Sequence, residues 1–69
     1  MKIINSKEFG QVVKNRRKKL RYTQKDVSKF LGVSASFISD LENGKKTAEL
    51  DKSLKLANIL GIDIEMKER

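Results

Sequence analysis

The stretch TQKDVSKFLGVSASFISDLENG, residues 23–44, decides the fold, because it predicts two short helices joined by a tight turn. Thr23 offers a hydroxyl that caps the first helix, and Asp26 completes a capping box three residues later. Gly32 ends this helix, since a residue without a Cβ tolerates the left-handed conformation of a sharp turn. Ser34 caps the second helix, which Gly44 ends. Isolated helices this short are marginal in water, so the rest of the chain must supply a core.

Apolar side chains within this stretch recur at helical spacing and predict which faces of the two helices are buried. Val27, Phe30 and Leu31 define the inner face of the first helix. Ile38 and Leu41 face inward from the second helix, which leaves its other face free.

Two further helices are expected to complete the core, one before this stretch and one after it. The earlier helix follows a cap at Asn5 or Ser6 and runs to about Leu20, and the later helix covers about Leu50 to Leu60. The inner face of the later helix is expected to carry Leu50, Leu54, Ala57 and Leu60. The predicted fold class is all-α, a small four-helix domain that takes in residues 1–69 as one unit.

The C-terminal residues change to a period of two, because Ile62, Ile64 and Met66 alternate with charged residues. This alternation is typical of a half-buried strand. A lone strand leaves its backbone hydrogen-bonding groups unpaired. We therefore expect a short β-strand over residues 62–67, paired with an N-terminal arm at residues 1–4 or with a second copy of the chain. Ile62, Ile64 and Met66 are the expected dimerisation residues.

The composition argues against several classes of function. The 69 residues include no cysteine and no histidine, which removes the thiol nucleophile and the commonest general base and metal ligand. The sequence has no glycine-rich phosphate loop and no metal-ligand spacing, so we expect no catalytic residues, no metal and no cofactor. No apolar run approaches the roughly 20 residues of a membrane span, and no signal peptide is evident. The expected location is the cytoplasm, in association with the nucleoid.

The charge is strongly basic and unevenly distributed. The net charge is +7, and residues 1–22 alone carry eight basic residues and one acid. Such an excess favours a polyanionic partner. The alternative is a solvated helix face that keeps the protein soluble.

Several short strings in this chain resemble the helix-turn-helix of the Xre and phage-repressor (Cro-type) family. They are TQ at 23–24, LGVS at 31–34, FIS at 37–39, LENGKK at 41–46 and LKLANILGI at 54–62. The resemblance covers about residues 14–61, and it departs mildly at Ser28, where alanine is usual. It implies a DNA-binding transcriptional regulator, most simply a dimeric repressor. The alternative is a plain helical bundle with an ordinary helical hairpin.

A recognition helix must offer one polar face to the major groove while its other face stays in the core. The residues expected to contact bases are Ala35, Ser36, Ser39 and Asp40. Ala35 can touch a thymine methyl group, and the two serines can donate or accept hydrogen bonds. Asp40 could accept from a cytosine amino group or be a solvated acid. Since no arginine or glutamine points outward, DNA shape and the N-terminal arm are expected to add to a modest base specificity.

The resemblance also implies contacts with phosphates and one structural ion pair. Gln24 is expected to hold a phosphate at the start of its helix, where the helix dipole favours an anion. The full set of expected phosphate contacts is Arg21, Thr23, Gln24, Ser34, Asn43, Lys45 and Lys46, with the Gly44 backbone beside them. Arg17 and Glu42 are expected to form an ion pair between the first and third helices.

The short chain, its N-terminal arm and its strand-like tail resemble the HipB-type antitoxin branch of the family. Members of that branch are dimers that repress their own operon and bind a HipA-type kinase toxin. The resemblance therefore implies duplex DNA and a second copy as partners, with a HipA-type kinase as a further candidate. The alternative is a stand-alone repressor of a phage or a small operon. In either case a two-fold dimer would bind half-sites about one turn of duplex apart.

Overall fold

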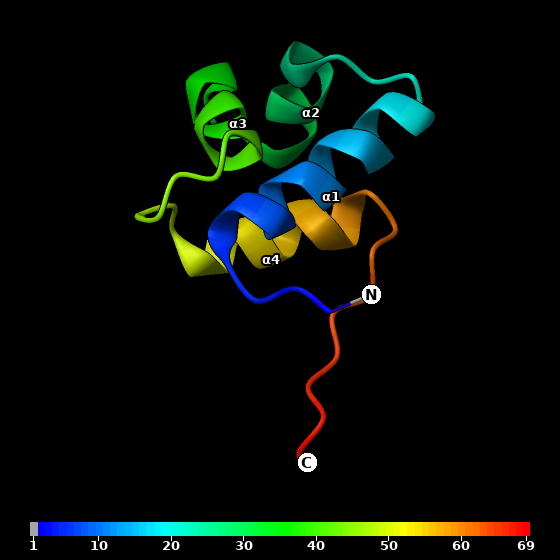
Figure 1. Ribbon diagram of the computed structural model, residues 1–69. Coiled ribbons are helices and arrows are strands. Elements are labelled where there is room, and N and C mark those ends of the chain that lie inside the picture. The colour runs from blue at the N-terminus through cyan, green and yellow to red at the C-terminus, as the bar shows by residue number, and fades with distance from the viewer. Residues whose placement is uncertain (1) are drawn as a thin grey trace.

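The computed structural model describes residues 2–69, so Met1, part of the expected N-terminal arm, lies outside the described residues. Within that range the chain forms four helices and no strand (Figure 1): α1 (Ser6–Lys19), α2 (Gln24–Leu31), α3 (Ala35–Glu42) and α4 (Leu50–Ile59). α3 packs against α1 and α2, and α2 also contacts α4. The C-terminal tail leaves the bundle in an extended conformation (Figure 1). Among the helices of residues 2–69, none has both the length and the hydropathy of a membrane span.

The helix ends follow from local hydrogen bonds. The Thr23 hydroxyl accepts from the Asp26 backbone N–H at 3.0 Å, and the Asp26 carboxylate accepts from the Thr23 N–H at 2.9 Å, so the predicted capping box is present. Ser34 caps α3 in the same way, through the Phe37 N–H at 3.0 Å. Gly32 has a φ of 72°, the left-handed conformation that the turn between α2 and α3 requires.

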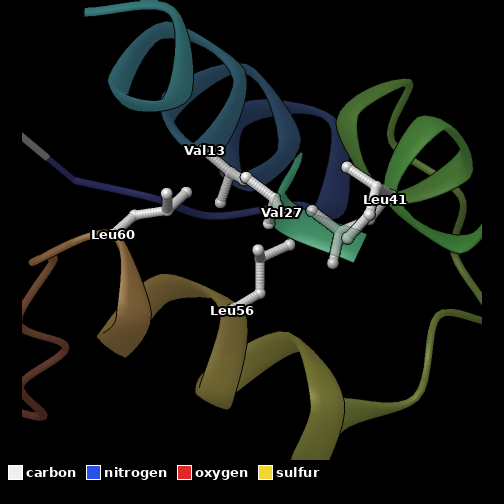
Figure 2. Packing of buried hydrophobic residues seen from close by; sticks show 6 residues of the cluster. Val13, Val27, Leu41, Leu56 and Leu60 are labelled. Carbon is white, nitrogen blue, oxygen red and sulfur yellow. The ribbon is translucent and has the colours of Figure 1, made fainter. Parts of the chain in front are cut away.

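The core gathers one buried side chain or more from each helix. Val13, Val27, Leu41 and Leu56 come from α1, α2, α3 and α4 in turn, and Leu60 follows the end of α4. Figure 2 shows these five side chains pointing toward one another. The core therefore depends on all four helices, as expected for two short helices that need neighbours.

The predicted inner face of α2 was partly wrong, because Phe30 is 53% exposed. The buried residues of α2 are Val27 and Ser28, with Leu31 half-buried. At about 100° per residue, this places the centre of the inner face well away from Phe30. The Phe30 ring instead meets the Tyr22 ring edge to face, with centroids 5.1 Å apart.

The predicted inner face of α4 was partly wrong: Ala57 and Leu60 are buried as expected, but Leu50 and Leu54 are not. Leu50 and Leu54 are 71% and 41% exposed, while Ser53, Leu56 and Ala57 are buried. Both sets have helical spacing, so periodicity alone does not separate them. Ser53 can lie inside because its hydroxyl donates to the Glu49 carbonyl at 2.7 Å, which leaves no polar group unpaired.

The predicted C-terminal strand at 62–67 was wrong for residues 2–69. The Ile62 N–H donates to the Ala57 carbonyl at 2.9 Å, and its side chain packs against the core, so Ile62 completes the end of α4. Beyond it, Ile64 and Met66 are 47% and 98% exposed. A strand needs a partner for its backbone groups, and the described chain supplies none.

Candidate nucleic-acid interface

α3 has one apolar face and one shallow polar face. Ile38 and Leu41 are buried, whereas Ala35 and Ser36 are exposed and Ser39 is half-buried. Small side chains on the outer face leave the backbone close to whatever lies against it. The structure therefore keeps the predicted base-contacting residues at the surface, outside the core.

Two polar pairs lie at the C-terminal end of this face. The Lys45 ammonium is 3.3 Å from the Asp40 carboxylate, and the Lys45 backbone N–H also donates to the Asp40 carbonyl at 3.0 Å. The Asn43 amide is 3.5 Å from the Ser39 hydroxyl. Asp40 is thus a half-buried acid with a basic neighbour, rather than an isolated charge on the face.

One side-chain hydrogen bond joins the start of α2 to the end of α3. The Gln24 amide donates to the Glu42 carboxylate at 3.1 Å.

Hydrogen bonds from Thr23, chiefly from its backbone N–H, hold the pKa of the Asp26 carboxyl below its ordinary value. Arg21 precedes this helix, is exposed and has a φ of 63°.

Arg17 and Glu42, which the resemblance pairs, form a buried two-pronged ion pair. The Arg17 Nε–Glu42 Oε2 distance is 2.6 Å and the Nη2–Oε1 distance is 3.0 Å, with only 9% and 1% of the two side chains exposed. Arg17 also donates to the Tyr22 carbonyl at 2.7 Å. The hydrogen bond with Glu42 raises the pKa of Arg17 further above its ordinary value. One guanidinium therefore joins α1, the end of α3 and the segment that leads into α2.

Two residues outside the predicted site set, Gly10 and Arg16, fix how α1 packs against α3 and the end of α4. A Cβ on Gly10 would collide with the backbone carbonyl oxygens of Leu41 and Glu42, so α1 and α3 approach closely there. Arg16 donates to the Leu60 carbonyl at 2.7 Å and so ties the end of α4 to α1. A glycine inside a predicted helix indicates such close packing, but no local signal in the sequence indicates the partner of Arg16.

The predicted site residues thus include two contacting pairs, both near the C-terminal end of α3. Gln24 and Glu42 are brought together directly, and Asp40 and Lys45 form a second pair. Thr23 and Ser34 are exposed N-caps whose hydroxyls serve their own helices. Lys46 is exposed in the loop between α3 and α4. The C-terminal tail after α4 extends away from the bundle (Figure 1), and Ile64 and Met66 within it are exposed.

Comparison with known proteins places this geometry in a family. The sequence pattern of the helix-turn-helix family matches residues 13–66. The chain is 27% identical over 64 residues to the "ImmF control region 10 kDa protein" of Bacillus phage phi105, a match that covers 93% of this chain and 71% of that protein. It is 40% identical over 53 residues to a protein of Saccharolobus islandicus named as an HTH-type transcriptional regulatory protein. That match covers 77% of this chain but only 17% of the relative.

Two solved structures share the whole fold. They are a HipB–O4 20mer complex and a HipA–HipB–O2–O3 complex, each with a TM-score of 0.89, 22% identity and coverage of 99% of this chain and 96% of the matched chain. At this identity the likeness shows a common fold. Because the family's pattern covers most of the chain and includes both α2 and α3, this chain belongs to the helix-turn-helix family of Xre-type DNA-binding transcriptional regulators.

Proposed function

We propose that this chain is a repressor that binds duplex DNA as a two-fold dimer, with α3 in the major groove. The observation that carries the proposal is the shallow outer face of α3, where Ala35 and Ser36 are exposed while Ile38 and Leu41 anchor the opposite side. A helix held in this way can approach base edges without losing its core contacts. In this proposal the chain acts in the cytoplasm at the nucleoid, and it needs neither catalysis nor a cofactor.

Base contacts in this proposal come from Ala35, Ser36, Ser39 and Asp40. Phosphate contacts come from Arg21, Thr23, Gln24, Ser34, Asn43, Lys45 and Lys46. Gln24 keeps one amide hydrogen free while the other is shared with Glu42. A phosphate could therefore bind there without breaking the contact between α2 and α3.

Selection of binding sites from random duplex DNA tests the proposal most directly. A dimer predicts a palindrome whose half-sites are about 10–10.5 base pairs apart, centre to centre. Recovery of unrelated sequences with no shared motif would contradict sequence-specific repression. Recovery of a single half-site would contradict the dimer alone.

The phosphate contacts of the loop after α3 are tested by salt dependence. Lys45 and Lys46 changed together to Ala should flatten the slope of log affinity against log salt by up to about 1.8 for each bound protomer, or about 3.6 for the dimer, since each phosphate contact accounts for about 0.9. Lys46→Ala should be measured separately, because Lys45 also neutralises Asp40. Lys52→Ala with Lys55→Ala is a control of equal charge on α4. Equal slopes for both double variants would exclude the loop contacts.

The dimer is supported by the exposed apolar residues of the tail. Ile64 and Met66 are exposed on an extended segment whose backbone groups are free to pair, and Ile62 begins that segment at the core. Removal of residues 63–69 keeps Ile62 in place, so the core should survive. Sedimentation should then show a dimer become a monomer, and an unchanged mass would place the dimer interface elsewhere.

A second candidate function is that of an antitoxin. It is supported by the likeness to HipB, including HipB in the HipA–HipB–O2–O3 complex. This candidate predicts a kinase-like reading frame beside the gene, whose product co-purifies with the chain and loses activity in the complex. Failure of that product to bind the purified chain would favour the stand-alone repressor.

A further inference from the structure

Three lysines form a row along α1. Lys7, Lys14 and Lys18 are spaced seven and four residues apart, which places them within about 20° of one line on a helix of 3.6 residues per turn. Lys7 and Lys18 are exposed and Lys14 is half-buried. Within residues 2–69, none of these three lysines forms an ion pair. The paired basic residues there are Arg17, Lys45, Lys52 and Lys55.

One end of this row lies against the loop that follows α3. A Cβ on Gly44 would lie 2.7 Å from the Lys7 Cα, so the two backbones are in close contact. The Ser6 hydroxyl donates to the Gly44 carbonyl at 3.0 Å. Lys7 is therefore a neighbour of Lys45 and Lys46, the proposed phosphate contacts of that loop.

The other end of the row lies against the segment that leads into α2. The Arg21 N–H donates to the Lys18 carbonyl at 2.9 Å, and Arg17 donates to the Tyr22 carbonyl at 2.7 Å. Lys18 is thus close in the chain and in space to Arg21 and to the cap of α2. The row therefore runs from the proposed phosphate contacts in the loop after α3 to those at the start of α2.

The rest of the positive charge of α1 is used in other ways. Arg17 is paired with Glu42, and Arg16 donates to the carbonyl at the end of α4. Lys19 is exposed but lies about 120° around the helix from Lys7, away from the row. Both acids of α3 are already paired, Glu42 with Arg17 in the interior and Asp40 with Lys45.

We propose that Lys7, Lys14 and Lys18 form a third contact with the DNA backbone, outside the helix-turn-helix itself. This proposal rests on the proposed function, because it takes α3 to lie in the major groove. The phosphates of the strand beside α3 then run past the row between the loop at residues 43–46 and the start of α2. The row adds affinity and salt dependence without reading bases.

The test compares two triple variants of the full chain that lose the same charge. The row variant combines Lys7→Gln, Lys14→Gln and Lys18→Gln, and the control variant combines Lys19→Gln, Lys52→Gln and Lys55→Gln. Glutamine keeps helix propensity close to that of lysine, and thermal unfolding followed by circular dichroism checks the fold. Binding to one selected duplex is measured from about 50 to 200 mM salt, the range over which phosphate contacts change affinity most visibly.

The row variant should lose up to about 2.7 from the salt slope for each bound protomer, or about 5.4 for the dimer, at about 0.9 per phosphate, while the control keeps a slope near that of the wild type. Equal slopes for the two variants would overturn the lysine row and leave the proposed function intact, as long as the wild type binds. If the wild type binds no duplex, both proposals fail. If the row variant does not fold, Lys18→Gln is compared with its neighbour Lys19→Gln, and only the former should lower the slope.

Discussion

α3 and α4 join the bundle through contacts of different kinds. α3 meets α1 at a close backbone approach at Gly10 and through the buried pair of Arg17 with Glu42. Apart from one hydrogen bond from Arg16 to the Leu60 carbonyl at its end, α4 is held mainly by aliphatic side chains such as Leu56 and Ala57. The free energy of burying them depends on the apolar area buried rather than on direction. Buried hydrogen bonds and close backbone contacts hold a helix in one position relative to its neighbours. Aliphatic packing allows the helix to shift slightly, because side chains of similar volume can repack. The helix that the proposed function places in the major groove is held by the more directional contacts.

The largest effect is expected at the ion pair. Glu42→Ala leaves Arg17 buried without its carboxylate, and loss of one partner of a buried pair costs about 3–5 kcal/mol in the free energy of unfolding. Denaturant unfolding measures this loss. The matched control is Asp51→Ala, which breaks an exposed pair with Lys55 and should cost at most about 1 kcal/mol. Similar costs for the two variants would contradict the directional role of the pair.

The next largest effect is expected at the backbone approach. Gly10→Ala should destabilise the fold by about 1–3 kcal/mol, because the new methyl group collides with backbone carbonyls that cannot move aside. Helix propensity alone predicts a gain of about 1 kcal/mol, so the sign of the change is diagnostic. Lys19→Ala, an exposed change on the same helix, should stay within about 0.5 kcal/mol. A stabilised Gly10→Ala variant would show that α1 and α3 can separate at little cost.

A smaller effect is expected in the aliphatic contact of α4. Leu56→Met conserves volume and should cost less than about 1.5 kcal/mol, even though Leu56 is fully buried. DNA affinity should stay close to that of the wild type, since α3 keeps its contacts with α1. A loss of stability as large as that of Glu42→Ala would show that α4 is as strictly positioned as α3.

The smallest effect, and a gain, is expected at the start of α4. Thr23 and Ser34 cap α2 and α3, but Glu49 at the corresponding position of α4 makes no capping hydrogen bond. Glu49→Asp shortens the side chain toward the free N–H groups and keeps a charge near Lys52, so it should stabilise the fold by about 0.5–1 kcal/mol. A thermal melt would detect this as a small rise in Tm. No gain would indicate that α4 is already held by its tertiary contacts.

The ends of α2 and α3, their inner residues Val27, Ile38 and Leu41, and the family of the chain could be predicted from the sequence. Caps and glycine turns act within a few residues, so the sequence carries their whole physical cause. The outer face of α3 follows from the same periodicity, because a helix with two buried apolar residues must turn its other side outward.

Only the tertiary structure decided which of two apolar stripes of α4 lies inside, and it turned Leu54 out and Ser53 in. It also decided that Phe30 lies at the surface and that the tail beyond Ile62 finds no strand partner within residues 2–69. The tertiary structure likewise decided that Gln24 contacts Glu42 and that Arg16 contacts the Leu60 carbonyl. Each of these outcomes depends on a neighbour far away in the sequence, and local spacing contains no information about where that neighbour packs.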